Sequence, residues 1–322
     1  MRILVLTAMY PSPERPVSGT FVQEQVESLR AAGAEVEVMA FDGARSFRNY
    51  IRAGMCLRKR VREQHFDVVH AHYGLTGLPA RMQFACPIVL TYHGSDLLGQ
   101  VGPEGNYTAS GRLKVLLSKL LGFTVNDRII VASLLQTRWW KAHIIPMGVD
   151  MDLFQPQSRE EARARLSLHP TRRYVLFVAN PSNKGKRFDI AKEAVDLLAL
   201  TGMDVEILPV FKVPHDQIPL YMGAADVLAL TSDHEASPCV IKEALASNLP
   251  IVSVRVGDVE ERIAGVNGCF LCSQTPSDVA DKLQLALAHS GPTNGREAVK
   301  TISLKETARR TISVLEAATG MH

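Results

Sequence analysis

The chain has 322 residues, more than one hydrophobic core usually serves, so two domains of about 150 residues each are expected. Hydrophobic residues make up 46% of the chain and charged residues 21%, which excludes a disordered or fibrous protein. The net charge of +3 does not indicate a nucleic-acid partner. Five scattered cysteines, an odd number, suit a reducing, cytoplasmic compartment better than a disulfide framework.

The first half of the chain predicts β-strands separated by helical segments. Short runs rich in Val, Ile and Leu are typical of parallel sheets that are covered on both faces, and they span residues 2–8, 35–41, 67–72, 87–93 and 128–133. The segment 21–33 predicts a helix with Gly33 as its C-cap. The N-terminal run is read as a buried strand and not as a signal peptide. No stretch reaches the 18 or so apolar residues of a membrane-spanning helix, so any membrane contact is expected to be peripheral.

The second half repeats the pattern after a link rich in turns. Residues 141–166 pass from a strand through this link into a charged helix, which predicts domains at 1–152 and 153–304. Further strands are expected at residues 174–180, 205–211, 227–232, 250–256 and 268–273. The predicted fold class is α/β, with two Rossmann-like doubly wound domains facing across a cleft where the carboxyl ends of the strands bind ligands.

Two glutamates flank a predicted helix start in the segment SDHEASPCVIKEALASNLP, residues 232–250. For a random pair, a loop acid and a solvent-facing helix position would be the simpler interpretation. Glu235 and Glu243 are eight positions apart, or about 12 Å along a helix, whereas glycosidase carboxylates lie about 5 to 9.5 Å apart. The two acids therefore have different tasks. Free N–H groups after Pro238 favour a diphosphate, so the acid before them can meet an attached sugar and the later acid can accept from ribose hydroxyls.

The ordered set of motifs resembles the retaining glycosyltransferases of family 4. The motif EASPCVIKE resembles the donor-binding signature of that family, and IIPMGVDMDLFQP (144–156) resembles its interdomain segment. VVHAHYG and LTYHGSD are similar to its acceptor-domain strand ends, and NPSNKGKRFDIAKEA to its basic loop. The resemblance implies a GT-B fold whose C-terminal helix, about 305–322, packs back on the first domain. It also implies a transferase of class EC 2.4 that moves a sugar from a nucleotide diphosphate sugar to a glycan or lipid-linked acceptor in polysaccharide or glycoconjugate synthesis.

The same resemblance implies roles for individual residues. Glu235 would contact the transferred sugar and Glu243 the ribose, while Lys186 and Arg187 would hold the diphosphate, with Lys184 as a rival. The other implied residues are His93 facing the sugar, Gly19 in a flexible loop near the diphosphate, Asn180, Ala236, Ser237, Cys239 and Val240 on the donor, and His72 and Asp96 on the acceptor side. The pair His70 and His72 is interpreted as structural or acceptor-contacting, not metal-binding. For Asp96, capping of the following turn is an equal alternative.

This chain departs from the family pattern at several of these positions. Ala179 and Asn180 stand where the family often has Gly-Arg, and Met147 stands where it has asparagine. Ala236 and Cys239 replace a common glycine and asparagine. These departures put the second cation of the diphosphate site in doubt and leave donor choice open.

The expected chemistry requires neither a metal nor a cofactor. Two cations and the helix N–H groups would stabilise the departing diphosphate, and the resemblance implies retention by a same-face displacement. A Rossmann oxidoreductase is disfavoured because no GxGxxG follows the first strand. A sugar-nucleotide epimerase, or a non-catalytic sugar-nucleotide-binding partner of another transferase, remains the alternative.

Two basic segments carry apolar residues at near-helical spacing, at residues 48–62 and 111–122. A solvated helix face is one interpretation. Adhesion to an anionic membrane surface is the other, and it would place the protein on the inner face of the cell membrane.

Overall fold

The computed structural model describes residues 1–15, 18–43, 46–99, 108–289 and 291–320. The chain divides into two compact units, of which unit 1 comprises Met1–Gly148 with Leu304–His322 and unit 2 comprises Val149–Ser303. The sequence predicted that the chain leaves the first domain after residue 152 and returns to it at about residue 305. Gly148 is the last residue of the first segment of unit 1, and a Cβ there would meet the Thr307 hydroxyl of α13 at 2.4 Å.

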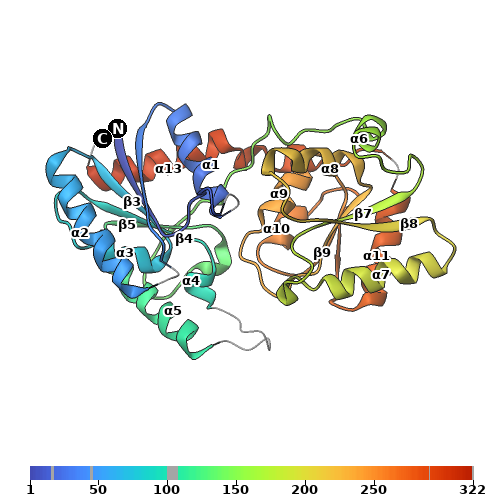
Figure 1. The fold of residues 1–322 in the computed structure, drawn as a ribbon, viewed down its shortest axis with the longest axis horizontal. Helices are drawn as coiled ribbons and strands as arrows, with labels where there is room; N and C mark the ends of the chain where they lie inside the picture. Colours follow the sequence, from blue (N-terminus) through green and yellow to red (C-terminus); the bar gives the residue numbers. More distant parts are fainter. Residues whose placement is uncertain (16–17, 44–45, 100–107, 290, 321–322) are drawn as a thin grey trace. The chain divides into compact units, whose positions relative to one another are not determined.

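Unit 1 is built on a parallel sheet with the order β2-β1-β3-β4-β5-β6 (Figure 1). Its strands are β1 (Arg2–Thr7), β2 (Glu35–Ala40), β3 (Val68–His72), β4 (Ile88–Tyr92), β5 (Asp127–Ile130) and β6 (His143–Ile144). Its helices are α1 (Thr20–Ala31), α2 (Phe47–Glu63), α3 (Gly77–Ala80), α4 (Ser95–Leu98), α5 (Ala109–Leu121) and α13 (Leu304–Thr319). The predicted strands are confirmed within a few residues at each end.

The core of unit 1 explains the position of α13, the last helix. Val22 and Val26 of α1 pack with Ile3 and Val5 of β1, and Leu315 of α13 joins the same cluster. The spacing of four between Val22 and Val26 puts both on one helical face. The last helix therefore completes the core of the first half of the chain.

Unit 2 is built on a second parallel sheet with the order β11-β10-β9-β7-β8. Its strands are β7 (Arg173–Val178), β8 (Val205–Val210), β9 (Val227–Leu230), β10 (Ile251–Val254) and β11 (Phe270–Cys272). Its helices are α6 (Arg159–Arg165), α7 (Phe188–Leu200), α8 (Ile218–Ala224), α9 (Cys239–Ala246), α10 (Val259–Ile263), α11 (Pro276–Ala288) and α12 (Gly295–Ala298).

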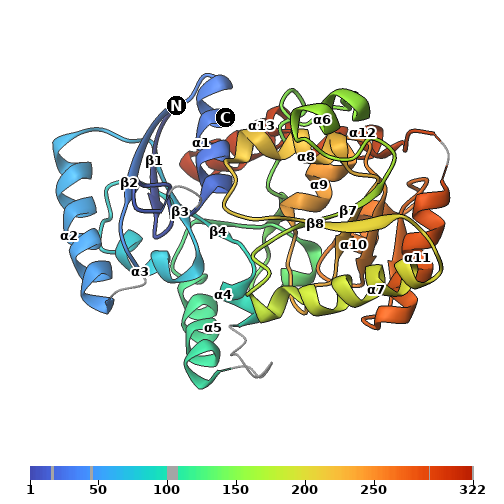
Figure 2. The same cartoon turned by 45° about the vertical axis from the view of Figure 1, so that its right-hand side comes forward.

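Both faces of this second sheet are covered, which is why its inner strands β9 and β10 are continuous runs of buried residues. Val175 and Phe177 of β7 pack in one cluster with α7 and α11, while Leu176 packs on the opposite face with residues of α9. Figure 2 shows α7 and α11 on one side of the sheet and α9 on the other.

The strand order of each unit reverses at one point. In unit 2 the first strand, β7, lies between β8 and β9, and in unit 1 β1 lies between β2 and β3. Loops that follow the two strands at such a point diverge and leave room for a ligand at the carboxyl edge of the sheet. The structure therefore favours a site at one place in each unit. In unit 2 it is formed by the loops after β7 and β9, and in unit 1 by the loops after β1 and β3.

Candidate functional site

The loop between β7 and α7 carries the predicted cations. Residues Lys184–Lys186 form one 3-10 turn, in which Asn183 Oδ1 accepts from the Gly185 N–H at 3.1 Å. Lys186 Nζ donates to Glu235 Oε1 at 2.5 Å. This contact joins the loop after β7 to the loop after β9, as the reversal of strand order leads one to expect.

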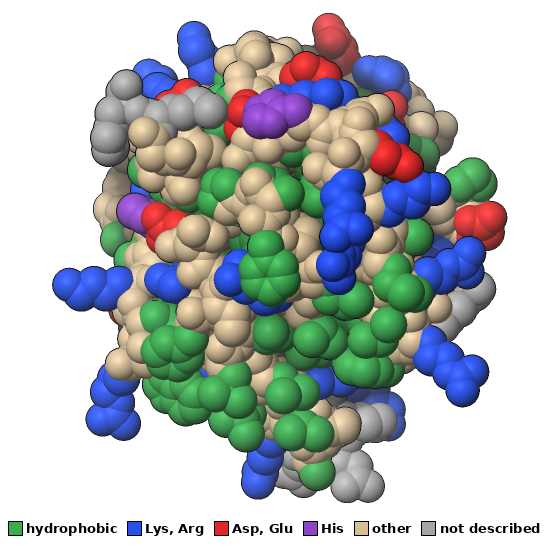
Figure 3. Space-filling model, turned by 90° about the vertical axis from the view of Figure 1, so that its left-hand side faces the viewer, with side chains coloured by type: hydrophobic (Ala, Val, Ile, Leu, Met, Phe, Trp, Pro, Cys, Tyr) green, Lys and Arg blue, Asp and Glu red, His purple; other side chains and the backbone are tan. Residues whose placement is uncertain are grey.

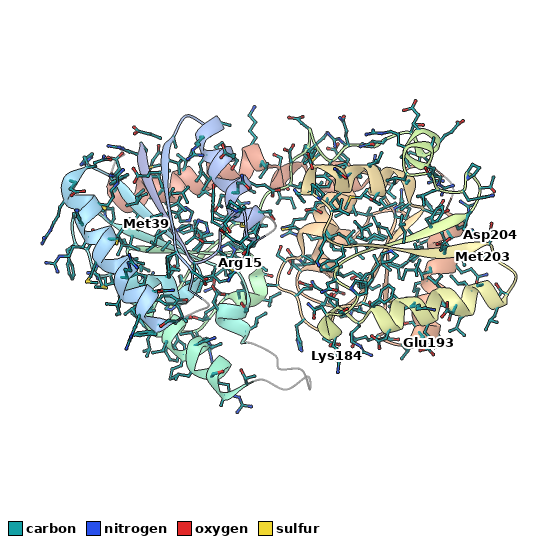
Figure 4. All side chains as sticks on the ribbon, in the orientation of Figure 1. Arg15, Met39, Lys184, Glu193, Met203 and Asp204 are labelled. Atoms are coloured by element: carbon teal, nitrogen blue, oxygen red, sulfur yellow. The ribbon has the colours of Figure 1, made fainter. Side chains whose placement is uncertain are left out.

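Arg187 follows in a left-handed conformation with φ 53° and turns the chain into α7. Its guanidinium donates to Asp189 Oδ2 at 3.0 Å and to Asp233 Oδ1 at 3.3 Å. The hydrogen bonds to the Asp189 carboxylate raise the pKa of Arg187. Lys184 is exposed at the lower edge of unit 2 (Figure 4). The geometry thus brings Lys186 and Arg187 to the acids of the β9–α9 loop, whereas the Lys184 side chain faces solvent.

The loop between β9 and α9 holds the first glutamate. The Glu235 side chain is 16% exposed, and the following Ala236 is buried. Pro238 is the N-cap residue, with ψ 121°, and α9 begins one residue later at Cys239. Cys239 and Val240 are half-buried at the start of that helix.

Glu243 lies in the second turn of α9 and is nearly buried. Its Oε1 is 3.1 Å from His215 Nε2. The His215 ring in turn packs against Phe154 at 5.3 Å between centroids. The contact with His215 orients the carboxylate of Glu243.

The β10–α10 loop fixes the position of the β9–α9 loop. Asp258 donates its N–H to Ala236 O at 3.1 Å and accepts from Ser237 Oγ at 2.8 Å. Buried Lys242 donates to Ser237 Oγ at 3.3 Å. Gly257 has φ 58°, and a Cβ there would meet Ala236 O at 2.7 Å. The contacts with Asp258, Lys242 and Gly257 thus fix the positions of Ala236 and Ser237.

The remaining donor-side residues lie in turns or at helix starts. Asn180 Oδ1 accepts from the Ser182 N–H at 3.0 Å and shapes the turn before Lys184. Gly19 immediately precedes α1 with φ 74°, and a Cβ there would meet Met9 O at 2.5 Å. Only glycine fits that position in unit 1.

In unit 1 the ends of β3 and β4 are joined by a buried carboxylate. Asp96 accepts backbone N–H bonds from Gly74 at 3.0 Å, Gly94 at 2.8 Å and His93 at 3.1 Å. Burial raises the pKa of this carboxyl, an effect that the N–H bonds oppose. The capping alternative for Asp96 therefore corresponds to contacts in the structure, and its acceptor-side role stays a prediction.

His93 contacts a stack of buried histidines. Its Nε2 is 3.0 Å from His72 Nδ1, and the His72 and His70 ring centroids are 4.3 Å apart. His70 Nε2 is 2.8 Å from Thr91 Oγ1. Burial lowers the pKa of His70 to about 4 and that of His72 well below its usual 6.5. Because His72 is fully buried, it can act on an acceptor only through His93.

Within the described ranges, no group of three or more His, Cys, Asp or Glu side chains is placed to hold a metal ion. The same part of the chain contains no helix long and apolar enough to cross a membrane.

Sequence reasoning missed the residues that support the glutamates from other loops. His215, Gly257 and Asp258 lie far from Glu235 in the sequence, and their contacts depend on the order of the strands. A weak signal was present, because Gly257 and Asp258 directly follow the strand predicted at 250–256, and Gly and Asp are typical turn residues.

Two parallel-sheet units of this kind, together in one chain, are the architecture of the GT-B fold. Residues 18–153 match the family model for Glycosyltransferase Family 4, and residues 184–289 match the model for Glycosyl transferases group 1. The chain belongs to the glycosyltransferases of family 4 and is a transferase. The first match falls mostly in unit 1 and the second falls within unit 2.

Curated relatives are similar at low identity. The putative teichuronic acid biosynthesis glycosyltransferase TuaC of Bacillus subtilis is 23% identical, over 80% of this chain and 82% of the relative. The D-inositol 3-phosphate glycosyltransferase of Mycolicibacterium gilvum is 26% identical over 73% of this chain. This chain covers only 62% of the length of that second relative.

Solved structures agree in fold. Sucrose-phosphate synthase from Thermosynechococcus elongatus has a TM-score of 0.81 at 18% identity and covers all of both chains. Anabaena HepE, solved in complex with UDP-glucose, has a TM-score of 0.70 at 16% identity, over 98% of this chain and 100% of its own. At such identities the likeness carries the fold alone.

Proposed function

We propose that this protein transfers a sugar, with retention of configuration and without a metal ion, from a nucleoside diphosphate sugar to a glycan acceptor. The observation that carries this proposal is the contact of Lys186 with Glu235 at the reversal of strand order in unit 2. We assign the cation of this pair to the diphosphate and the acid to the sugar. The complex of HepE with UDP-glucose supports a donor of this class.

The donor is proposed to lie across the start of α9. Lys186 and Arg187 bind the diphosphate, and the N–H groups at the first turn of α9 add to the attraction. Glu243, oriented by His215, accepts hydrogen bonds from the ribose hydroxyls. Ala236 and Ser237 let the donor approach the backbone, with Asn180, Cys239 and Val240 around it.

The ion pair between Lys186 and Glu235 is proposed to open when the donor binds. A diphosphate carries more negative charge than one carboxylate, so it can take over the ammonium group of Lys186. Glu235 then becomes available to accept from the hydroxyls of the sugar. In this exchange the ammonium group of Lys186 passes from one anion to another, and the Glu235 carboxylate takes neutral hydroxyl donors in place of the ammonium group.

Bond cleavage leaves positive charge on the sugar ring and negative charge on the departing diphosphate. Preorganised cations at the diphosphate lower the barrier most, so Lys186 and Arg187 take the part that a metal ion plays elsewhere. The leaving phosphate oxygen is proposed to receive the acceptor proton on the same face of the sugar. That step breaks the sugar–phosphate bond, forms the glycosidic bond and releases a nucleoside diphosphate.

Unit 1 is proposed to serve the acceptor and the reacting end of the sugar. His93 is the residue assigned to the sugar, His72 orients its ring through the Nδ1–Nε2 contact, and Asp96 holds the backbone of both loops. Gly19 keeps the loop before α1 close to Met9. The similarity to TuaC, a putative teichuronic acid biosynthesis glycosyltransferase, supports an acceptor from polysaccharide synthesis. The proposed acceptors include lipid-linked glycans.

A radiolabelled-donor assay with matched lysine variants tests this function. Lys186→Met is expected to lower kcat by about 10²–10³-fold, whereas Lys192→Met on the exposed side of α7 leaves it unchanged. A loss in Lys184→Met as large as that in Lys186→Met would contradict the assigned register. NMR of the product gives the anomeric configuration, and an inverted linkage would contradict retention.

The two alternatives give different outcomes in the same assay. Isomerised sugar nucleotide formed without any acceptor would identify an epimerase. A donor that binds and is never turned over, with any acceptor, would identify a non-catalytic partner.

A further inference from the structure

Helix α5 packs on unit 1 with its smallest residues. Gly111 and Ser118 are buried, and a Cβ added to Gly74 would meet Ser118 Cβ at 2.4 Å. Tyr92 Oη donates to the Ser118 carbonyl at 2.9 Å. A Cβ at Gly122, directly after the helix, would meet the Trp140 ring at 2.3 Å. The close approach of backbones leaves no room for large side chains on this face.

The large apolar residues of α5 consequently point outward. Leu113, Leu116, Leu117 and Leu120 are 57%, 44%, 41% and 47% exposed, and Phe123 just after the helix is 58% exposed. We call these five residues the α5 stripe. Their spacing of three and four places the leucines on one helical face. In an ordinary surface helix this face would be buried in the core.

The α5 stripe continues onto neighbouring elements. Phe123 and Trp139 lie 6.1 Å apart between ring centroids, and Trp139 is 42% exposed. Helix α3 contacts both α5 and α2, and α2 exposes Phe47 and Met55. Figure 3 shows hydrophobic side chains gathered over the lower part of this face of unit 1, with Lys and Arg around them. Such an apolar surface marks an interaction site.

The charged side chains of the two segments that carry the α5 stripe and Trp139 have one sign, and Asp127 between these segments contacts His143. Residues 109–123 contain Arg112, Lys114 and Lys119 and no acidic residue. Arg138 and Lys141 flank Trp139 and its neighbour, again without an acid from 128 to 149. A second copy docked on the same surface would bring these cations together. An anionic lipid surface attracts the cations and accepts the apolar side chains.

We propose that the α5 stripe, with Trp139, docks unit 1 on an anionic lipid bilayer. The leucines and Phe123 enter the boundary between headgroups and acyl chains, and the Lys and Arg side chains contact the headgroup phosphates. Trp139 lies at the level where tryptophan is enriched in membrane proteins. This docking does not depend on the proposed sugar transfer, since it can be measured without donor or acceptor.

Co-sedimentation of the full chain with vesicles tests the docking. The wild type is expected to bind vesicles of phosphatidylcholine with phosphatidylglycerol, to bind vesicles of phosphatidylcholine alone more weakly, and to release as salt is raised. Leu116→Ser with Leu120→Ser is expected to weaken binding about tenfold or more. The matched control replaces Leu197 and Leu200, two exposed leucines of α7, by serine and is expected to bind like the wild type.

Charge and fluorescence complete the test. Arg112→Glu with Lys114→Glu is expected to abolish the preference for phosphatidylglycerol, and circular dichroism shows whether each variant is folded. Brominated lipid is expected to quench wild-type fluorescence and to quench Trp139→Phe much less. Equal binding by both leucine pairs, or no binding by the wild type, would overturn the proposal. A dimer in light scattering that the α5 substitutions abolish, without vesicle binding, would assign the α5 stripe to self-association instead.

Discussion

The buried imidazole of His70 makes the stability of unit 1 depend on pH. Its folded pKa is about 4, below the ordinary 6.5, because burial disfavours the charged form. The unfolded chain therefore binds the proton more readily, so the free energy of unfolding falls as pH drops from about 6.5 towards 4. From these two pKa values the loss for His70 alone is about 2 kcal/mol at pH 5 relative to pH 8.

His70→Phe removes this titration and keeps an aromatic ring of similar size. It loses the hydrogen bond to Thr91, a cost that is the same at every pH. Urea unfolding followed by circular dichroism at pH 8 and pH 5 gives the difference for each protein. The variant is expected to lose about 2 kcal/mol less than the wild type between the two values. The control, His169→Asn, removes an exposed imidazole and is expected to follow the wild type. An unchanged loss in His70→Phe would refute the reasoning.

Further outcomes follow from contacts around the site. Gly257→Ala is expected to weaken nucleotide binding by pushing on Ala236 O, while Gly265→Ala, also at positive φ but with open space around it, is not; equal calorimetric affinities would contradict this. Arg163→Met removes the 2.7 Å partner of the buried Asp226 carboxylate, which keeps Arg159 and Arg173, and is expected to cost about 2 kcal/mol in urea unfolding; a cost near zero would show that the pair is dispensable. Dialysis against EDTA is expected to leave turnover unchanged, whereas a loss restored by Mg²⁺ would show that the proposed cations are not sufficient.

Inner strands such as β1, β4 and β9 were predictable because they are apolar runs buried on both faces, a pattern that needs no tertiary information. The two-residue strand β6 shows the limit of prediction from apolar runs. His143 and Ile144 are exposed, so only the motifs before and after them indicate a strand. The helix expected at 21–33 runs from Thr20 to Ala31, with Gly33 at φ 91° just beyond it.

Contacts between loops could not be predicted in the same way. The pair His215 and Glu243 and the pair Asp258 and Ser237 form only once β8, β7, β9 and β10 have taken their order in the sheet. The orientation of α5 shows a different limit. Its leucine spacing indicates an amphipathic helix, but the face that packs is chosen by backbone approach at Gly74 and Ser118, which favours small residues over large ones.

Calorimetry of donor binding tests the central claim most directly. UDP, GDP and their common sugar conjugates are titrated into the wild type, Glu243→Ala and the control Glu193→Ala, which changes an exposed acid on α7 (Figure 4). One nucleotide is expected to bind the wild type and the control equally, and to bind Glu243→Ala about 10- to 100-fold more weakly because hydrogen bonds to a charged group are lost. Unchanged affinity in Glu243→Ala, or no binding of any nucleotide, would contradict the placement of the donor on α9.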